Sequence, residues 1–241
     1  MLNFRYNISG GIMQRYFAKE RNNDEFILNN DDMRHIKLVM RMKDNDEIIV
    51  VQDKKPYLCY LLENKVIIKE KLESYANDLP YVCLIIPILK ENKMDYILQK
   101  STEMGVSEII TYYAERSVIK ETNNNQKKLD RWMRIIKEAS EQCHRLDIPK
   151  ISIKNLNELA LEGKNIICTT NEKSQYLKKI LKSIDIYDRI NIVIGPEGGF
   201  SEKEEELLLK SFVPTTLGQR ILRVETVPLF VMSVINYEIM E

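Results

Sequence analysis

The segment INIVIGPEGGFSEKEEELLLK, residues 190–210, contains a predicted strand, a glycine-rich turn and a predicted helix in that order. The strand covers 190–194. Ser201 and Glu204 have the spacing of a capping box, which fixes the start of a helix over 201–211. Because strand, turn and helix in succession form the repeating element of α/β proteins, this segment predicts an α/β domain.

Three glycines and a proline separate the predicted strand from the predicted helix: Gly195, Pro196, Gly198 and Gly199. Glycine lets the backbone approach a ligand closely and leaves N–H groups free. The spacing is not that of the dinucleotide motif G-x-G-x-x-G, and no G-K-[ST] follows as in a P-loop. The loop is therefore either a ligand-binding loop or a tight β–α turn, and spacing alone decides for neither.

Strands and helices alternate on both sides of this segment. We therefore expect an α/β domain with a parallel sheet over residues 81–241, preceded by a linker at 73–80. Short strand-like runs predict a small β-barrel at 13–72, and residues 1–12 form an extension without a clear pattern. The other expected elements are strands at 26–28, 48–51, 57–62, 66–68, 82–86, 108–112, 165–169 and 215–217, and helices at 31–40, 93–104, 127–145, 174–183 and 226–240.

Composition limits the classes of function. The 241 residues include 36 Lys and Arg and 36 Asp and Glu, so the net charge is zero, which excludes a polybasic binder but not a local basic face. Four cysteines without a C-x-x-C pair favour a reducing, cytoplasmic location, and two histidines make a metal site unexpected. The longest apolar run, 81–89, is too short to span a membrane.

A second glycine-marked strand end is LGQRILRVET, residues 217–226. Arg220, Arg223 and Glu225 crowd a loop at the end of a predicted parallel strand, where α/β folds place ligands. Thr226 suits the N-cap of the last helix. The loop is either part of a site or a solvated loop with one salt bridge, and its closeness to the first glycine loop favours a shared pocket. A third strand end, 169–172, is polar but on its own favours an ordinary loop.

Two helices carry further signals. Arg131, Arg134 and Arg145 lie off the apolar stripe of the helix expected at 127–145, where RNA phosphates could contact them, although most charged helix faces are merely solvated. The last helix is apolar almost all round, so we expect it to be buried in the core or against a partner.

Several ordered blocks, specific only in combination, carry a resemblance that extends from about residue 14 to the C-terminus. They are Gln14 to Phe17, His35 to Arg41, Lys93 to Asp95 with Gln99 to Val106, Glu115 to Ser117, Glu141 to Cys143, Ile194 to Gly199, and Leu217-Gly218 with Arg220 to Thr226. With these blocks the sequence resembles the 16S rRNA (uracil-N3)-methyltransferase family called RsmE, in the SPOUT superfamily of knotted methyltransferases.

The resemblance implies a PUA-like barrel, then a SPOUT domain with a deep trefoil knot, in a homodimer with the active site near the interface. It implies S-adenosylmethionine as the cofactor and 16S rRNA, in the assembled small ribosomal subunit, as the partner. We expect RNA contacts from Arg15 and Arg41 of the barrel together with Arg131, Arg134 and Arg145. The implied cofactor-binding residues are Thr169, Thr170, Glu172, Ile194, Gly195, Pro196, Glu197, Gly198, Gly199, Leu217, Gly218, Ile221, Leu222 and Thr226.

Methylation of uracil N3 requires that the N3 proton leave and that the resulting negative charge be stabilised. A guanidinium suits this anion, so Arg223, or Arg116 from the other subunit, is the expected stabiliser. Glu225 is the candidate to accept the proton or to orient the arginine. Two alternatives stay open: an rRNA-binding α/β protein without catalysis, and a nucleotide-binding enzyme, against which the missing P-loop lysine counts.

Overall fold

The computed structural model describes residues 13–74, 79–121, 124–185 and 188–239, so the extension expected at 1–12 lies outside the described residues. The contacts between residues divide the chain into two units. Of the described residues, the first unit contains 13–74 together with 140–147, and the second contains the others.

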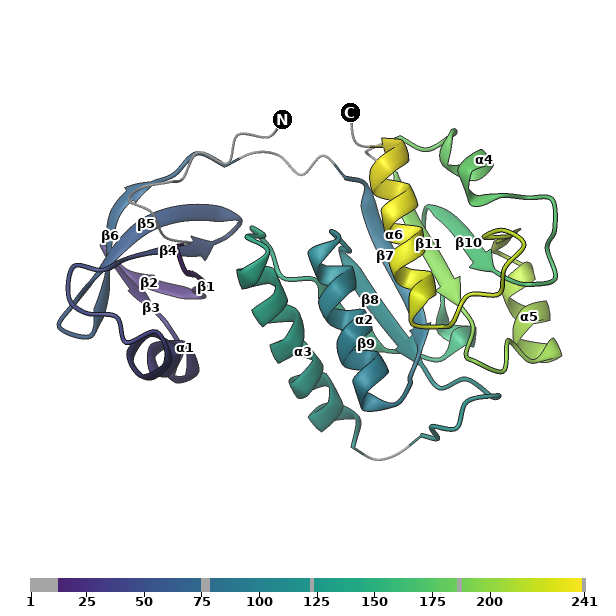
Figure 1. Ribbon diagram of the computed structural model, residues 1–241, viewed down its shortest axis with the longest axis horizontal. Coiled ribbons are helices and arrows are strands. Elements are labelled where there is room, and N and C mark those ends of the chain that lie inside the picture. Colours follow the sequence, from purple (N-terminus) through teal and green to yellow (C-terminus); the bar gives the residue numbers. More distant parts are fainter. Residues whose placement is uncertain (1–12, 75–78, 122–123, 186–187, 240–241) are drawn as a thin grey trace. The chain divides into compact units, whose positions relative to one another are not determined.

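The first unit is built on a six-stranded sheet with the order β1-β4-β5-β6-β3-β2 (Figure 1). β1 pairs with β4 in parallel, and the other neighbours are antiparallel. Tyr16, Phe26, Ile36, Val50 and Cys59 are among its buried core residues. The elements are β1 (Arg15–Phe17), β2 (Glu20–Asn22), β3 (Glu25–Ile27), α1 (Asn30–Arg34), the π-helix η1 (His35–Val39), β4 (Glu47–Gln52), β5 (Lys55–Leu62) and β6 (Lys65–Lys71).

The prediction of a single helix at 31–40 is wrong in one respect. The α-helix ends at Arg34, and a π-helix follows it directly. The Asn29 side chain accepts a hydrogen bond from the Asp32 N–H at 2.8 Å and so caps the first turn. The strands expected between 48 and 68 are confirmed, and β1 and β2 are additional strands that the sequence pattern did not indicate.

The second unit contains a six-stranded sheet with the order β12-β10-β11-β7-β8-β9, and every neighbouring pair is parallel. The predicted parallel α/β architecture is confirmed. Its elements are β7 (Tyr81–Pro87), α2 (Glu91–Glu103), β8 (Glu108–Tyr112), α3 (Asn125–Gln142), β9 (Lys150–Ile153), the 3-10 helix η2 (Leu156–Glu158), β10 (Lys164–Cys168), α4 (Leu177–Leu181), β11 (Arg189–Ile194), α5 (Glu202–Leu209), β12 (Val213–Thr215) and α6 (Thr226–Ile239).

Both faces of this sheet are covered, as the alternation along β7 shows. Leu84 packs in the cluster that includes residues of α2, α3, α4 and α6, whereas Ile85 packs in the cluster that includes Leu208 of α5. Figure 1 shows α3, α2 and α6 in a row over one face. A strand that is buried on both faces reads as a continuous apolar run, which explains why β7 is apolar throughout.

Two helix ends have the same backbone geometry but different residues. Gly105, with φ of +92°, ends α2 where the sequence predicted a stop. α3 ends at Gln142, three residues before the end expected at Arg145. His144, with φ of +62°, takes the left-handed position, and the Arg145 N–H bonds the Ser140 carbonyl at 2.9 Å. Arg145 therefore lies beyond the helix.

Candidate functional site

The carboxyl ends of β10, β11 and β12 lie at one edge of the second sheet, because parallel strands end on the same side. β12 covers 213–215, two residues earlier than expected, so Leu217 belongs to the loop that follows it. The Thr169 N–H donates to the Thr215 carbonyl at 3.1 Å, which joins two of these ends. The buried Tyr112 hydroxyl, from β8, donates to the Ile194 carbonyl at 2.8 Å and fixes the end of β11.

The glycine loop after β11 is a tight turn that also presents open backbone. The Gly199 N–H donates to the Pro196 carbonyl at 2.9 Å, and Gly199 has φ of +70°. A Cβ at Gly199 would meet no atom within 4 Å. A Cβ at Gly195 would lie 3.1 Å from the ring of Phe200, so Gly195 has a packing role. Gly198 and Gly199 are exposed, and Pro196 is buried.

Arg116 lies beside this loop within the same chain. A Cβ at Gly198 would lie 3.1 Å from the Arg116 carbonyl oxygen and 3.2 Å from its Cβ. The neighbouring Glu115 N–H donates to the buried carboxylate of Glu204 at 2.9 Å. Glu204 also accepts from the Ser201 N–H at 2.8 Å, so the predicted capping box of α5 is confirmed. One glutamate therefore caps α5 and holds the segment that carries Arg116.

Lys93, near the start of α2, joins the two glycine-marked loops. Its Nζ lies 3.1 Å from the Glu197 carboxylate in the first loop and 2.9 Å from the Glu225 carboxylate in the second. Lys93 thus forms an electrostatic link between the two loops that the sequence predicted to share a pocket. Lys93 belongs to one of the blocks that carry the family resemblance, but no local pattern marks it as a site residue.

Glu225 is held in its ionised form. Burial by itself raises the pKa of a carboxyl group, but the hydrogen bond from Lys93, that from its own backbone N–H, and the charges of Lys93 and Arg223 outweigh burial, so the pKa of Glu225 is lowered. A carboxylate with a lowered pKa is a weak base. This electrostatic environment favours the expected orienting role of Glu225 over proton acceptance.

The rest of the second loop alternates between packed and open residues. Leu217 and Leu222 pack against the core, whereas Ile221 is 85% exposed. The Gly218 N–H donates to the Thr216 hydroxyl at 3.3 Å, and Gly218 has φ of +119° with no atom within 4 Å of a Cβ placed there. Arg223 is exposed, and its carbonyl accepts from the N–H of Thr226, the first residue of α6, at 2.9 Å.

The loop after β10 is fixed by a glutamate of α5. Glu205 accepts from the Thr169 hydroxyl at 2.5 Å and from the Asn171 side-chain amide at 2.7 Å. The Thr170 carbonyl accepts from the Lys173 ammonium. The run of acids in α5 looks like a solvated helix face in the sequence, so the role of Glu205 became visible only in three dimensions.

Glu172 closes this loop with its own side chain. Its Oε1 accepts from the N–H groups of Lys173 at 2.8 Å, Ser174 at 2.6 Å and Gln175 at 2.9 Å. The hydrogen bonds from Ser174 and Gln175 are the main reason that the pKa of Glu172 falls to about 2. Glu172 therefore shapes the loop, and this oxygen is already saturated.

The arginines expected to contact RNA occupy different environments. Arg134 and Arg41 are exposed, and Arg41 has φ of +54°. Arg131 pairs with Asp95 of α2 at 2.5 Å. The Arg145 side chain is only 11% exposed and pairs with Asp147 at 2.8 Å, and the Arg15 guanidinium donates to the carbonyls of residues 144 and 145.

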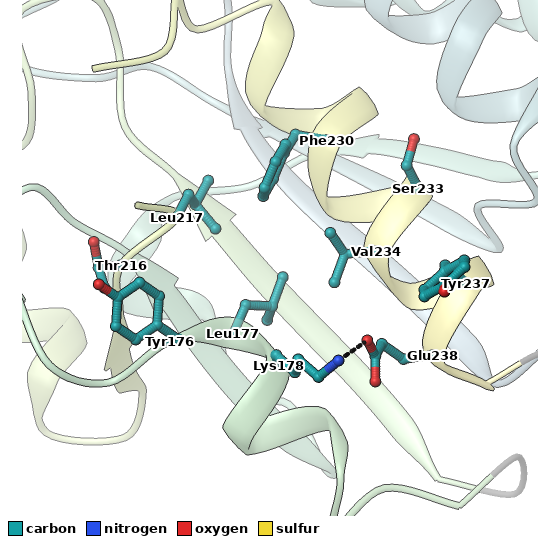
Figure 2. Close-up of a pocket in the computed structure, with 10 residues that line it drawn as sticks. All are labelled: Tyr176, Leu177, Lys178, Thr216, Leu217, Phe230, Ser233, Val234, Tyr237 and Glu238. Carbon is teal, nitrogen blue, oxygen red and sulfur yellow. Dashed lines mark ion pairs between the residues drawn. The ribbon is translucent and has the colours of Figure 1, made fainter. Parts of the chain in front are cut away.

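An open apolar groove of about 550 Å³ lies beside α6 (Figure 2). One face of α6, with Val231, Met232 and Ile235, is buried in the core. Phe230, Val234 and Tyr237 line the groove on another face of the helix, and Tyr237 is 84% exposed. The helix that is apolar all round is thus only partly covered within this chain. Tyr176, Leu177 and Leu217 line the opposite side, and Lys178 pairs with Glu238 at 2.8 Å.

Within the described ranges, no helix has the length and apolar character needed to cross a bilayer. In the same part of the chain, no group of three or more His, Cys, Asp or Glu side chains is arranged to hold a metal ion.

Comparisons with known proteins agree with this geometry. A family model described as an RNA methyltransferase domain matches residues 77–236, and one described as an RNA methyltransferase PUA domain matches residues 28–70. The chain is 35% identical to ribosomal RNA small subunit methyltransferase E of Mesomycoplasma hyopneumoniae, over 92% of this chain and 98% of that protein. It is 33% identical to the protein of the same name from Bacillus subtilis, over 94% and 97%.

Solved structures give the same result. The crystal structure of ribosomal RNA small subunit methyltransferase E from Neisseria gonorrhoeae, bound to S-adenosyl methionine, is 28% identical with a TM-score of 0.81, over 94% of this chain and 98% of that one. A putative methyltransferase from Legionella pneumophila, in complex with the same cofactor, is 26% identical with a TM-score of 0.84, over 94% and 98%.

The hydrogen bonds to Glu172 predict a pH dependence. Because its pKa is about 2 in the fold and about 4.5 without these bonds, the ionised side chain stabilises the fold at neutral pH, and this contribution is lost as the pH falls from about 4.5 to 2. We expect Glu172→Gln to lower the free energy of unfolding at pH 7. Below about pH 4.5, the difference in this free energy between the variant and the unsubstituted chain should become smaller.

Urea unfolding across this pH range measures that difference, and carboxyl-carbon NMR measures the Glu172 titration directly. Glu162→Gln, at an exposed glutamate, is the matched control and should show no such narrowing. A Glu172 midpoint near 4.5 would contradict the proposed bonding.

Proposed function

The chain belongs to the RNA methyltransferase family that includes ribosomal RNA small subunit methyltransferase E, and from that premise we propose that it methylates N3 of a uridine in 16S rRNA with S-adenosylmethionine as methyl donor. The observation that carries the proposal is the meeting of the loops after β11 and β12 at one sheet edge, joined through Lys93. Membership of the family supports methylation of ribosomal RNA with S-adenosylmethionine, and N3 of uracil is the atom that we propose is methylated.

The residues at this edge fit the cofactor. Gly199 and Gly218 leave open backbone where a Cβ would meet nothing, which suits a close approach by a ligand. We propose that the residues named from the resemblance in the loops 169–172, 194–199 and 217–222, together with Thr226, hold it. Glu172 contributes by shaping its loop. S-adenosylmethionine supplies an electrophilic methyl group, so the protein need not activate the donor.

The chain's own task is to stabilise the uracil anion. Transfer of the N3 proton to a water molecule places negative charge on N3 and the flanking oxygens, and a fixed guanidinium in the site lowers the energy of that charge. We assign this role to Arg223, which is exposed at the loop and two residues from Glu225. Arg116 is a second candidate, beside Gly198 in the same chain. Glu225, being ionised and paired, orients rather than accepts the proton.

The two domains have separate roles, and the chain works as a pair on the small ribosomal subunit. The domain at 13–72 acts as an RNA-binding PUA-like domain, and the domain at 81–241, in which α6 packs on α2 and α4, acts as a knotted catalytic domain. Because ribosomal RNA is the substrate, the enzyme works in the cytoplasm on the small subunit. The open face of α6 around Phe230 and Val234 is covered by a second copy of the chain.

Arg223 provides the direct test of the mechanism. We expect Arg223→Ala to lower kcat for methyl transfer about 100-fold or more, because a preformed charge opposite the anion is lost. Affinity for S-adenosylmethionine should stay within about twofold, since Arg223 is not among the residues assigned to the cofactor. The measurement is mass spectrometry of small-subunit rRNA after incubation with labelled cofactor, with calorimetry for binding.

Arg220→Ala, at a second exposed arginine of the same loop, is the control and should retain most activity. Equal rates for Arg223→Ala and the unsubstituted chain would contradict the assignment. A chain that binds rRNA but shows no saturable cofactor binding would instead be an RNA-binding protein without catalysis.

Arg134 tests the RNA face. Because Arg131 is paired and Arg134 is exposed, we expect Arg134→Glu to weaken methyl transfer to small subunits and to reduce the salt dependence of RNA binding by about one phosphate contact. Cofactor affinity should not change. Lys203→Glu, the same charge change at an exposed position of α5, serves as control; if both variants behave alike, the RNA lies elsewhere.

Assembly is tested by mass in solution. The chain mass is 28.4 kDa, and we expect light scattering at micromolar concentration to give about twice that value, since closed twofold pairs are the commonest symmetric assembly. Phe230→Asp should shift the mass toward that of one chain, because it places a charge in the apolar face. Val118→Asp, at another exposed apolar position, should leave it unchanged, and a single-chain mass for the unsubstituted protein would refute the dimer.

A further inference from the structure

We propose that Lys93 is a positioning residue that sets the two glycine-marked loops relative to each other by pairing with one carboxylate from each. The inference deepens the proposed function, on which it rests, because those loops are the ones assigned to the cofactor and the uracil anion. It adds a residue from α2 to a site built mainly from the loops after β10, β11 and β12.

The place of Lys93 in the fold makes its ammonium a fixed reference point. It is the third residue of α2, and its N–H donates to the Lys90 carbonyl at 3.0 Å. The same helix buries Met94, Ile97 and Leu98 in the core, so its position against the sheet is determined by packing. The two loops that contact Lys93 are anchored by packing only in part: Pro196, Leu217 and Leu222 are packed, whereas Gly198, Gly199 and residues 218–221 are exposed.

The two ion pairs act as one unit. Glu197 and Glu225 both lie within 3.1 Å of the same Nζ, so the two carboxylates are close to each other and would repel without the cation between them. Loss of the Lys93 charge would affect Glu225 more than Glu197, because the Glu225 side chain is only 19% exposed and water screens it less. The raised pKa of Lys93 and the lowered pKa of Glu225 agree with this mutual stabilisation.

Both partners of Lys93 stand next to groups with a direct task. Glu197 immediately precedes Gly198, which packs against Arg116, and Gly199, where a Cβ would meet no atom within 4 Å at the proposed cofactor loop. Glu225 lies two residues after Arg223 and immediately before α6. A shift of either carboxylate therefore moves either the cofactor-binding backbone or the guanidinium, and Lys93 couples the two movements.

Three variants separate this role from general stability. Lys93→Met removes the charge but keeps a long apolar stem, and Lys93→Arg keeps the charge. Lys100→Met is the matched control on the same helix, because Lys100 is similarly exposed and pairs with Glu103 at 2.9 Å rather than with Glu197 or Glu225. Hydrogen exchange of residues 195–199 and 217–225, measured without cofactor, reports the loops directly. Calorimetry then gives the affinity for S-adenosylmethionine, and methyl transfer gives kcat.

We expect Lys93→Met to speed exchange in both loops at least threefold, to weaken cofactor binding about 3- to 10-fold, and to lower kcat even at saturating cofactor, in line with the loss of a partly buried pair. Lys93→Arg should keep the exchange rates, the cofactor affinity and kcat close to those of the unsubstituted chain. Lys100→Met should also leave all three quantities unchanged. In the double variant Lys93→Met/Glu225→Gln, the loss should be smaller than the sum of the single losses, because both changes remove the same pair.

Unchanged exchange in both loops of Lys93→Met would overturn the inference, as would fully additive losses in the double variant. The proposed function fails in a different way: if the unsubstituted chain binds no S-adenosylmethionine while Lys93→Met still frees both loops, Lys93 keeps its positioning role and the methyltransferase assignment is refuted.

Discussion

The parallel direction of all six strands in the second sheet is the constraint on which the site depends. It brings the ends of β10, β11 and β12 to one edge although they are far apart in the sequence. The chain leaves the central strand β7 toward β8 on one side and later returns to β11 on the other, which makes the boundary between β7 and β11 a switch point where α/β folds bind ligands. Lys93 follows β7 and Glu197 follows β11, so their ion pair crosses that boundary.

Helix α5 holds the other side of the site together. Two consecutive glutamates point to different loops: Glu204 bonds the N–H of Glu115 beside Arg116, and Glu205 bonds Thr169 and Asn171. Buried or partly buried carboxylates that accept several hydrogen bonds fix their partners more firmly than exposed ion pairs do. Side chains of a neighbouring helix therefore hold in place the loops that leave backbone groups open for a ligand.

Local patterns predicted those parts of the fold that local physics determines. The strands of the second sheet near 82–86, 108–112, 165–169 and 190–194, the capping box of α5 and the stop at Gly105 are all confirmed, because apolar periodicity and capping chemistry act within a few residues. The end of α3 was misjudged, since a histidine rather than glycine takes the left-handed position there. Lys93 could not be found, because its partners lie more than a hundred residues away and no spacing rule links them.

The distribution of charge explains how a chain with zero net charge can act on RNA. Several of its cations already have internal partners: Arg131 pairs with Asp95, Arg145 with Asp147, and Lys93 with two glutamates. Such pairs fix geometry but offer little attraction to phosphates, because counterion release requires cations that are free to replace salt ions. A chain whose net charge is zero, and in which several arginines are paired internally, relies on the shape of the RNA as well as on its exposed cations. A folded RNA surface, such as that of an assembled ribosomal subunit, therefore suits this distribution of charge better than an unstructured strand does.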